Sequence, residues 1–90
     1  MKRALVSELS NHRGAKVMLR GWVYRIRELS KVTFLVLRDR TGMIQVAMEP
    51  SLLGGVQLSV ESVVEIRGVV RNEPRAALGY EIEAHEPRFH

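Results

Sequence analysis

The sequence predicts an all-β fold, a small barrel of five strands that is closed or partly open. Five segments are rich in β-branched and aromatic residues, and turn-forming residues separate them. Two of the longer segments contain an internal glycine, Gly21 and Gly68, which is typical of a strand that bends sharply. Closing short strands into a barrel removes their exposed edges. The expected strands are 17–28, 32–39, 43–48, 61–72 and 80–84.

A short N-terminal helix is expected before the first strand, over residues 5–13. Ser7 can cap its start, and Gly14 follows where a left-handed residue would end it. Between the second and third strands, residues 39–42 (Asp-Arg-Thr-Gly) have the composition of a tight hairpin turn.

The connection between strands three and four, residues 49–60, is predicted to be short and irregular or briefly helical. Pro50 can open a helix, but Gly54 and Gly55 lie in the middle of the segment, so one or two turns are the most we expect. No internal repeat, low-complexity tract or long linker divides the chain. Residues 1–90 are therefore expected to form a single domain.

Composition excludes several classes of protein. The absence of cysteine excludes disulfides and cysteine-based zinc sites. No apolar run approaches the roughly 20 residues of a membrane span, so no membrane partner is expected. The N-terminus is basic, but no long apolar stretch follows it, so a signal peptide is not expected and the cytoplasm is the predicted location.

The net charge of +4 is unevenly distributed along the chain. Residues 1–42 carry ten Lys and Arg against three acids, whereas residues 43–90 carry four Arg against seven Glu. A basic half beside an acidic half is typical of a surface that binds phosphates, although a merely solvated face would look the same.

Alternation assigns the side chains of strands two and three to two faces. The purely apolar sets belong inside; they are Leu35 and Leu37 on one strand and Ile44, Val46 and Met48 on the other. The outer face then carries Phe34, Val36, Arg38 and Gln45, and strand one adds Val23, Arg25 and Arg27 on a shared face. An aromatic ring beside arginine and an amide can stack on a base, meet phosphate and bond a base edge. The alternatives are that the helix or residues 49–60 cover Phe34, and that Gln45 is only solvated.

Three segments together resemble a known family. They are GWVYRIREL (21–29), VTFLVLRDRTGMIQV (32–46) and VVEIRGVVRNEPRAALGYEIEA (63–84). They resemble the N-terminal anticodon-binding domain of aspartyl- and asparaginyl-tRNA synthetases, from about Leu5 to Ala84. The run from Pro74 to Ile82 looks most like archaeal-type aspartyl enzymes, including those that also charge asparagine tRNA. The resemblance implies a five-stranded OB-fold Greek-key barrel.

The resemblance also implies roles for single residues. Phe34 would stack on the middle anticodon base, Gln45 would recognise the third base, and Arg27 and Glu83 would contact the anticodon loop. The first base would be recognised near residues 72–78, the loop between strands four and five. The triplet Arg38-Asp39-Arg40 would mainly shape and charge the hairpin. The full set of expected nucleic-acid-binding residues is Phe34, Gln45, Arg27, Arg25, Glu83, Tyr24, Arg38, Asn72 and Arg75.

This chain departs from the family at three points. The connection at residues 49–60 holds a double glycine in place of a clear helix. Ile26 stands where bacterial aspartyl members often have another arginine, which weakens the expected basic patch. The chain also ends at His90, before the point where the family's catalytic module would begin.

No catalytic motif is recognisable in the 90 residues. The three histidines, His12, His85 and His90, lack metal-ligand spacing, and the Gly54-Gly55 pair lacks the Lys-Ser/Thr of a phosphate loop. The glutamates of the last strand are expected to be solvated or salt-bridged. We therefore expect no enzyme activity, no metal and no cofactor in this chain.

The expected function is recognition of the tRNA anticodon as part of an aspartyl-type synthetase. The expected partner is the anticodon stem-loop of tRNA-Asp, or of tRNA-Asn as well, and an asparaginyl parent stays open. The family's dimers rest largely on the catalytic module, so a monomer is expected. Two alternatives remain: an OB-fold protein that binds single-stranded nucleic acid without anticodon preference, and a protein-interaction module that keeps the fold.

Overall fold

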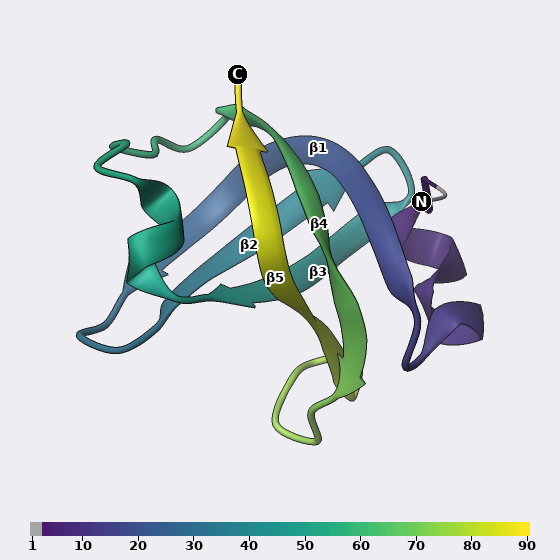
Figure 1. Cartoon of the computed structure of the whole chain (residues 1–90). Helices are drawn as coiled ribbons and strands as arrows, with labels where there is room; N and C mark the ends of the chain where they lie inside the picture. Colours follow the sequence, from purple (N-terminus) through teal and green to yellow (C-terminus); the bar gives the residue numbers. More distant parts are fainter. Residues whose placement is uncertain (1–2) are drawn as a thin grey trace.

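The structure is a computed structural model that describes residues 3–90; Met1 and Lys2, part of the predicted domain 1–90, lie outside the described residues. Five strands form a closed barrel in the order β1-β2-β3-β5-β4, and β4 closes on β1. All neighbours are antiparallel except β3 and β5. The elements are η1 (Val6–His12), β1 (Lys16–Glu28), β2 (Thr33–Asp39), β3 (Gly42–Met48), η2 (Pro50–Leu53), β4 (Val63–Asn72) and β5 (Tyr80–Phe89). The predicted five-stranded barrel is confirmed (Figure 1).

The long strand β1 serves two edges of the barrel, as its internal glycine predicts. Its first half pairs with β4 and its second half with β2, and the two pairings meet at Trp22. The adjacent Gly21 lies against the β2 backbone, where an added Cβ would be 2.3 Å from the carbonyl oxygen of Arg38. Only a residue without a side chain allows the strand to cross its neighbour so closely.

Strand β5 is longer than predicted, because it continues through Pro87 to Phe89. Its pairing with β4 shifts register between Arg67 and Gly68, so that His85 is the extra residue. Beyond Ala84, β5 pairs with β4 and with no other strand of the described residues. A proline is tolerated there because its missing N–H would face the unpaired edge.

The N-terminal helix is present as a 3₁₀ helix, but Ser7 does not cap it. Instead the β2–β3 hairpin accepts its free N–H groups: Val6 N donates to Asp39 Oδ2 (2.9 Å) and Ser7 N donates to Thr41 Oγ1 (3.0 Å). The other Asp39 oxygen accepts from Thr41 N and Oγ1, at 2.7 and 2.6 Å. One carboxylate therefore holds both the hairpin turn and the start of η1.

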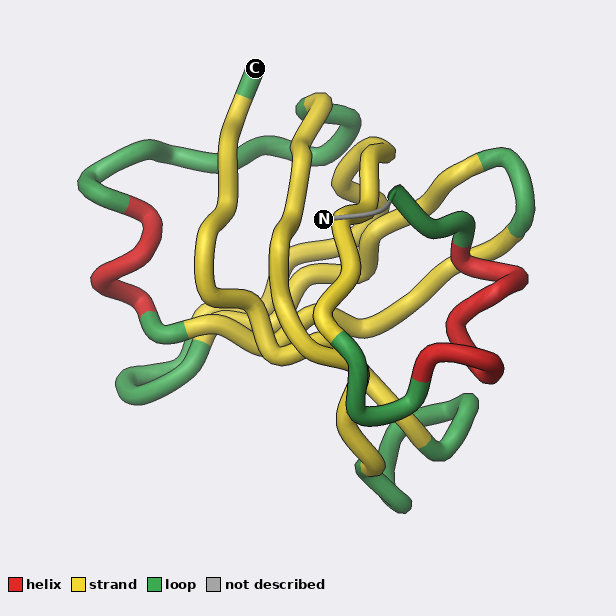
Figure 2. Tube along the Cα trace, turned by 45° about the vertical axis from the view of Figure 1, so that its right-hand side comes forward, coloured by secondary structure: helices red, strands yellow, loops and turns green. Residues whose placement is uncertain are grey.

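The second helical segment is a single 3₁₀ turn, as predicted for a proline-started segment with an early glycine. It ends at Gly54, whose φ of 58° is left-handed. Figure 2 shows η1 and η2 on opposite sides of the barrel. Neither segment contributes a residue to the lining of the hollow that contains Phe34.

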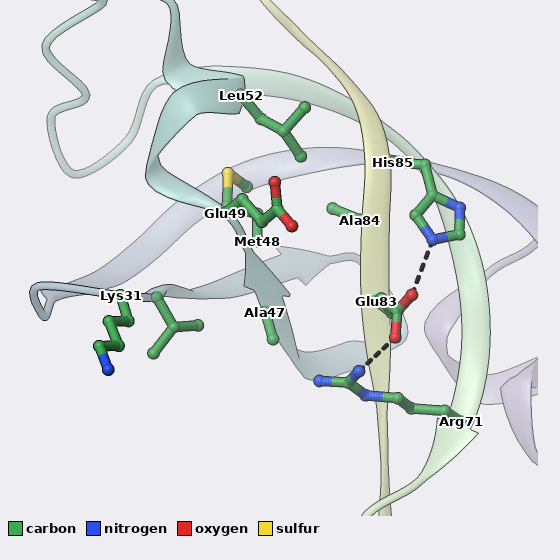
Figure 3. Close-up of a pocket in the computed structure, with 10 residues that line it drawn as sticks. Lys31, Ala47, Met48, Glu49, Leu52, Arg71, Glu83, Ala84 and His85 are labelled. Atoms are coloured by element: carbon green, nitrogen blue, oxygen red, sulfur yellow. Dashed lines mark hydrogen bonds and ion pairs between the residues drawn. The ribbon is translucent and has the colours of Figure 1, made fainter.

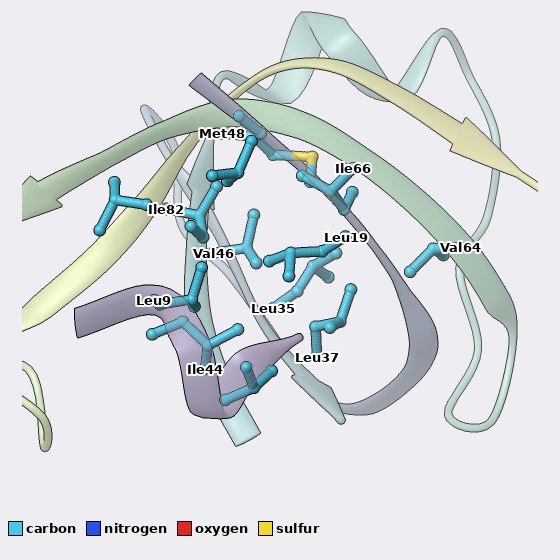
Figure 4. Packing of buried hydrophobic residues seen from close by; sticks show 14 of the residues in the cluster. Leu9, Leu19, Leu35, Leu37, Ile44, Val46, Met48, Val64, Ile66 and Ile82 are labelled. Atoms are coloured by element: carbon cyan, nitrogen blue, oxygen red, sulfur yellow. The ribbon is translucent and has the colours of Figure 1, made fainter. Parts of the chain in front are cut away.

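The core fills the barrel with aliphatic side chains (Figure 4). The predicted inner residues Leu35, Leu37, Ile44, Val46 and Met48 are all buried. Each such side chain contributes about 1.5–3 kcal/mol relative to an exposed one.

One face assignment is wrong. Val23 is fully buried, so it does not share the outer face with Arg25 and Arg27. The cause is a β-bulge between Val23 and Arg25, which inserts Tyr24 as an extra residue and reverses the alternation. Val23 and Ile26 therefore point to the core, while Tyr24, Arg25 and Arg27 are exposed.

Candidate nucleic-acid interface

The outer face of β1, β2 and β3 carries three rows of side chains. The register aligns Arg27, Phe34 and Ala47 in one row, then Arg25, Val36 and Gln45 in the next. The third row is Trp22, Arg38 and Met43. Phe34 and Val36 are half-buried, and the arginines beside them are exposed. Phe34, Gln45, Arg25 and Arg27 are thus brought together on one surface.

A groove of about 610 Å³, here called the outer groove, lies on this surface. Its floor is the outer face of β2 and β3, including Phe34 and Gln45. Arg25 and Arg27 of β1 form one wall, and residues of β4, β5 and the loop 73–79, including Arg75, form the other. Its size is that of a small-ligand site, and its walls carry both charge and apolar surface.

Gln45 is fixed by a partner that the sequence pattern does not reveal. Its Nε2 donates to Glu81 Oε1 at 2.7 Å, and Glu81 is only 2% exposed. The same carboxylate accepts from Arg71, with Nε at 2.8 Å from Oε2. Because a carboxylate only accepts, the amide nitrogen of Gln45 must face Glu81. The carbonyl oxygen of Gln45 and one N–H remain for a ligand.

The network continues from Arg71 to Glu83 and on to His85. Arg71 Nη1 pairs with Glu83 Oε2, and His85 Nε2 lies 2.8 Å from Glu83 Oε1. The hydrogen bond with His85 holds the pKa of Glu83 below its usual value, burial opposes this, and the charge of Arg71 adds to it. For Arg71, burial lowers the pKa, but the bonds to Glu81 and Glu83 outweigh it and raise the pKa. Both groups are therefore ionised at neutral pH.

A second hollow adjoins the outer groove at Val32 and Arg71, and Figure 3 shows it. Its lining includes Lys31, Glu49 and His85, and the chain Arg71–Glu83–His85 crosses its wall. Glu83 thus lies in this neighbouring hollow and not in the groove that holds Phe34 and Gln45.

The remaining predicted residues are placed around the groove. Arg75 lines it and pairs with Glu73, with Nε at 3.2 Å from Oε2. Asn72 does not line it; its Oδ1 accepts from Arg13 Nη1 at 3.4 Å.

Tyr24 and Arg38 lie beyond the groove, toward the hairpin. Tyr24 lines a further hollow that shares Arg25, Val36 and Gln45 with the groove. Arg38 lies over the rings of Trp22 and Tyr24, at 5.9 and 5.8 Å from their centroids. Of the triplet Arg38-Asp39-Arg40, it is Asp39 whose hydrogen bonds hold the hairpin turn.

The uneven charge of the sequence becomes an uneven surface. In the second half of the chain, acids pair with nearby arginines, as Arg71 does with Glu81 and Arg88 with Glu86. Within residues 3–90, neither Arg25, Arg27 nor Arg38 has an acidic partner. Part of the positive charge without an acidic partner therefore lies on the outer face of β1 and β2, where a phosphate backbone could reach it.

Two residues of the groove, Arg71 and Glu81, were missed by the sequence-based prediction, which gave Glu81 only a structural role. The parallel pairing of Val46 with Ile82 brings Gln45 beside Glu81, and this contact exists only once the barrel closes. One signal was available for Arg71: it directly precedes the loop expected to recognise the first base.

The described residues 3–90 contain no cluster of three or more potential metal ligands among His, Cys, Asp and Glu. None of the helices over the same range is long and apolar enough to cross a membrane.

Comparison with known proteins gives concordant results. Residues 17–88 match the tRNA anti-codon family, described as an OB-fold nucleic acid binding domain. The chain is 38% identical to asparagine–tRNA ligase of Pelotomaculum thermopropionicum over 92% of its length, which is 21% of that protein. It is 40% identical to aspartate–tRNA(Asp/Asn) ligase of Natronomonas pharaonis, over 77% of this chain and 17% of that one.

Among solved structures, asparaginyl-tRNA synthetase from Pyrococcus horikoshii superposes with a TM-score of 0.86. It is 29% identical and covers 97% of this chain and 22% of its own. The chain therefore spans about a fifth of the length of the relatives it matches. The names of these relatives include both asparagine and aspartate, so they do not decide between the two types.

The family match covers most of the chain, the five predicted strands form a closed barrel, and the named relatives are tRNA ligases. The predicted OB-fold is confirmed, and so is the resemblance to the anticodon-binding domain of aspartyl- and asparaginyl-tRNA synthetases. The chain belongs to the tRNA anti-codon family of OB-fold nucleic acid binding domains, as the anticodon-binding domain of an asparaginyl- or aspartyl-type tRNA ligase.

Proposed function

We propose that the outer groove binds the splayed anticodon loop of a tRNA on behalf of an aspartyl-type synthetase, and that it accepts both the aspartate triplet GUC and the asparagine triplet GUU. Phe34 stacks on the middle base, Gln45 bonds the edge of the third base, and Arg25 and Arg27 attract the backbone phosphates. Ligation of the amino acid belongs to the parent protein and not to this chain.

The single observation that carries the proposal is the fixed amide of Gln45 beside Phe34 in the same groove. Nε2 of Gln45 is 2.7 Å from a buried carboxylate oxygen of Glu81, which holds the amide at one depth above the sheet. Proteins recognise single-stranded RNA by stacking a base on an aromatic ring and bonding base edges with polar groups held nearby.

The chemistry of the amide supports acceptance of both triplets. Cytosine and uracil are the same size but differ at position 4, where cytosine carries an amino donor and uracil a carbonyl acceptor. The free carbonyl oxygen of Gln45 can accept from the first, and its remaining N–H can donate to the second. A purine is longer, so its edge would not meet an amide held at this depth.

The test is direct binding of the 90-residue domain to RNA stem-loops of equal length, at about 100 mM salt so that phosphate attraction does not dominate. The loops carry GUC, GUU, GUA or a scrambled triplet. We expect GUC and GUU to bind alike, and both to bind more tightly than GUA and the scrambled loop. Tight binding of GUC alone would restrict the domain to the aspartate triplet, and tight binding of GUU alone would indicate an asparaginyl parent.

Equal binding of all four loops would overturn anticodon recognition. It would favour the alternative, an OB-fold domain that binds single strands generally, because the stacking ring and the free arginines would still serve. Binding to none of the loops would move the function to a protein partner. The variant Arg88→Gln provides the control, since this exposed, acid-paired arginine lies outside the groove lining.

A further inference from the structure

The third row of the outer face carries a feature that recognition of three bases does not use. We propose that Trp22, Tyr24 and Arg38, here called the aromatic platform, bind a nucleotide that flanks the anticodon, by stacking on its base and pairing with its phosphate. This inference rests on the proposed function, because it extends the same RNA path beyond the triplet.

The side chains of the platform are open to solvent. Trp22 is 37% and Tyr24 42% exposed, which is unusual for rings of this size in a small barrel. Both rings are turned outward by the backbone: Trp22 precedes the buried Val23, and Tyr24 is the extra residue of the bulge. The bulge therefore adds an aromatic ring to a face that regular alternation would not give it.

Arg38 lies over both rings, and Arg25 also lies over the Tyr24 ring, at 5.9 Å from its centroid. The guanidinium carbon of Arg38 lies 5.9 Å from the Trp22 centroid and 5.8 Å from the Tyr24 centroid, near the outer limit of a cation–π contact. It has no acidic partner among the described residues, so its charge is available. Two stacking surfaces with a free guanidinium between them match a nucleotide, which offers a flat base and a phosphate.

The platform is continuous with the outer groove. The hollow lined by Tyr24 shares Arg25, Val36 and Gln45 with the groove. Along β2, Arg38 follows Phe34 by four residues, which is about 13 Å in an extended strand. That distance is too great for both to touch the same base. A strand whose middle base lies on Phe34 and whose third base lies at Gln45 therefore reaches the platform with a nucleotide outside the triplet.

A nucleic acid fits this surface better than a protein does. Within residues 3–90, Arg38 of the platform and the adjacent Arg25 have no acidic partner, and no acidic side chain lines the hollow that contains Tyr24. Trp22 also lines a separate hollow, whose lining includes Glu8 and Asp39. A protein partner would have to neutralise the two arginines, whereas a phosphate backbone brings the matching charge with it.

Binding at the platform can be followed by tryptophan fluorescence, because Trp22 is the one tryptophan of the chain. We would titrate the domain with the GUC stem-loop, following Trp22 emission and, separately, the anisotropy of labelled RNA. The same titrations would use loops in which one nucleotide flanking the triplet is abasic. The expected result is that RNA binding quenches Trp22 and that one abasic loop binds more weakly without quenching.

Substitution of Tyr24 completes the test. Tyr24→Ala should weaken binding of the intact loop by about 5- to 150-fold, the range for loss of one stacked base. It should bind the abasic and intact loops alike, because both changes remove the same contact. Tyr24→Phe keeps the ring and should bind like the wild type. Val60→Ala, which removes apolar surface from a more exposed residue (57%) outside the groove lining, should also have no effect.

The outcomes separate the platform from the proposed function. Suppose that the loops bind with triplet preference, that Trp22 emission does not change, and that Tyr24→Ala binds as tightly as the wild type. Nucleotide binding at the platform is then wrong, and anticodon recognition stands. If triplet preference is absent but Trp22 is quenched and Tyr24→Ala weakens binding, the platform stands as part of a general single-strand site. If no RNA binds, both are overturned.

Discussion

At the scale of single residues, Phe34 and Gln45 divide affinity from specificity. Every base has a π-face, so Phe34→Ala should weaken binding of all four stem-loops by about 1–3 kcal/mol. Gln45→Ala should leave binding of the scrambled loop nearly unchanged and remove the preference for GUC over GUA. The measurement is the set of four dissociation constants for each variant. Equal losses on every loop from both substitutions would contradict the separate roles.

Glu81 accepts a hydrogen bond from Gln45 and so fixes the Gln45 amide. Substitution of Glu81 should therefore have the same effect on triplet preference as substitution of Gln45. Glu81→Ala leaves Gln45 without its 2.7 Å partner and frees Arg71. We expect the GUC-over-GUA preference to fall by about 1–3 kcal/mol, the value of one specific base contact. Binding of the scrambled loop should stay the same or tighten, since a negative charge is lost.

The control for Glu81 is Glu86→Ala, which removes the same charge from the same strand. Glu86 is exposed, pairs with Arg67 and does not line the groove. Loop discrimination by Glu86→Ala should match the wild type. An equal loss of discrimination in both variants would mean that charge, and not the position of Gln45, is responsible.

At the scale of elements, Asp39 couples the β2–β3 hairpin to η1. Burial raises its pKa, but the hydrogen bonds from Thr41, Val6 and Gly42 outweigh burial and lower the pKa below 3.8. A carboxyl whose pKa is lowered by folding adds stability above its unfolded pKa, and this stability is lost as the pH falls through the folded pKa. The wild type should therefore lose stability in acid below about pH 4.

The variant Asp39→Asn should show a smaller loss in that same acid range. At neutral pH it should be less stable than the wild type by about 1–3 kcal/mol. The asparagine amide has one acceptor oxygen in place of two, so it cannot accept all four hydrogen bonds that Val6, Thr41 and Gly42 donate to Asp39. Urea unfolding at neutral pH and near pH 3 measures both effects. Glu28→Gln, a charge change at an exposed strand end, is the control and should follow the wild-type curve.

The crossing of β1 over β2 depends on Gly21. An added Cβ would lie 2.3 Å from the Arg38 carbonyl oxygen, and backbone cannot rotate away as a side chain can. Gly21→Ala should therefore cost about 3 kcal/mol, the upper end for overpacking. Gly14→Ala, with a φ of 82° but no atom within 4 Å of the new Cβ, should cost only about 1 kcal/mol of backbone strain. Thermal or urea unfolding would compare them, and similar losses would contradict the close-contact explanation.

At the scale of the whole molecule, the local pattern predicted the barrel and most of the outer face. The pairing of β2 with β3 has no register shift, so Phe34 and Gln45 were placed correctly from their neighbours alone. In β1 a bulge interrupts the alternation, and Val23 was assigned to the wrong face. Bulges depend on pairing with another strand, and a single strand's sequence does not contain that information.

The contacts that complete the groove are of the same non-local kind. Gln45 and Glu81 are 36 residues apart and meet because β3 and β5 pair in parallel to close the barrel. The hydrogen bond from Val6 to Asp39 spans 33 residues. Such partners follow from topology, so the sequence could name Gln45 as a candidate but could not show what orients it.

The free charge on the outer face makes a prediction for the molecule as a whole. For single strands, the logarithm of the binding constant falls with the logarithm of salt concentration by about 0.7 per phosphate neutralised. With Arg25, Arg27 and Arg38 unpaired, the slope for the GUC loop should be about −2.

The variant Arg27→Gln should reduce the magnitude of this slope by about 0.7. Arg88→Gln should leave it unchanged, because Arg88 already pairs with Glu86 at 3.6 Å and lies outside the groove lining. Binding constants at several salt concentrations give each slope. An equal reduction by both variants would mean that net charge, and not the position of free arginines on β1 and β2, attracts the RNA.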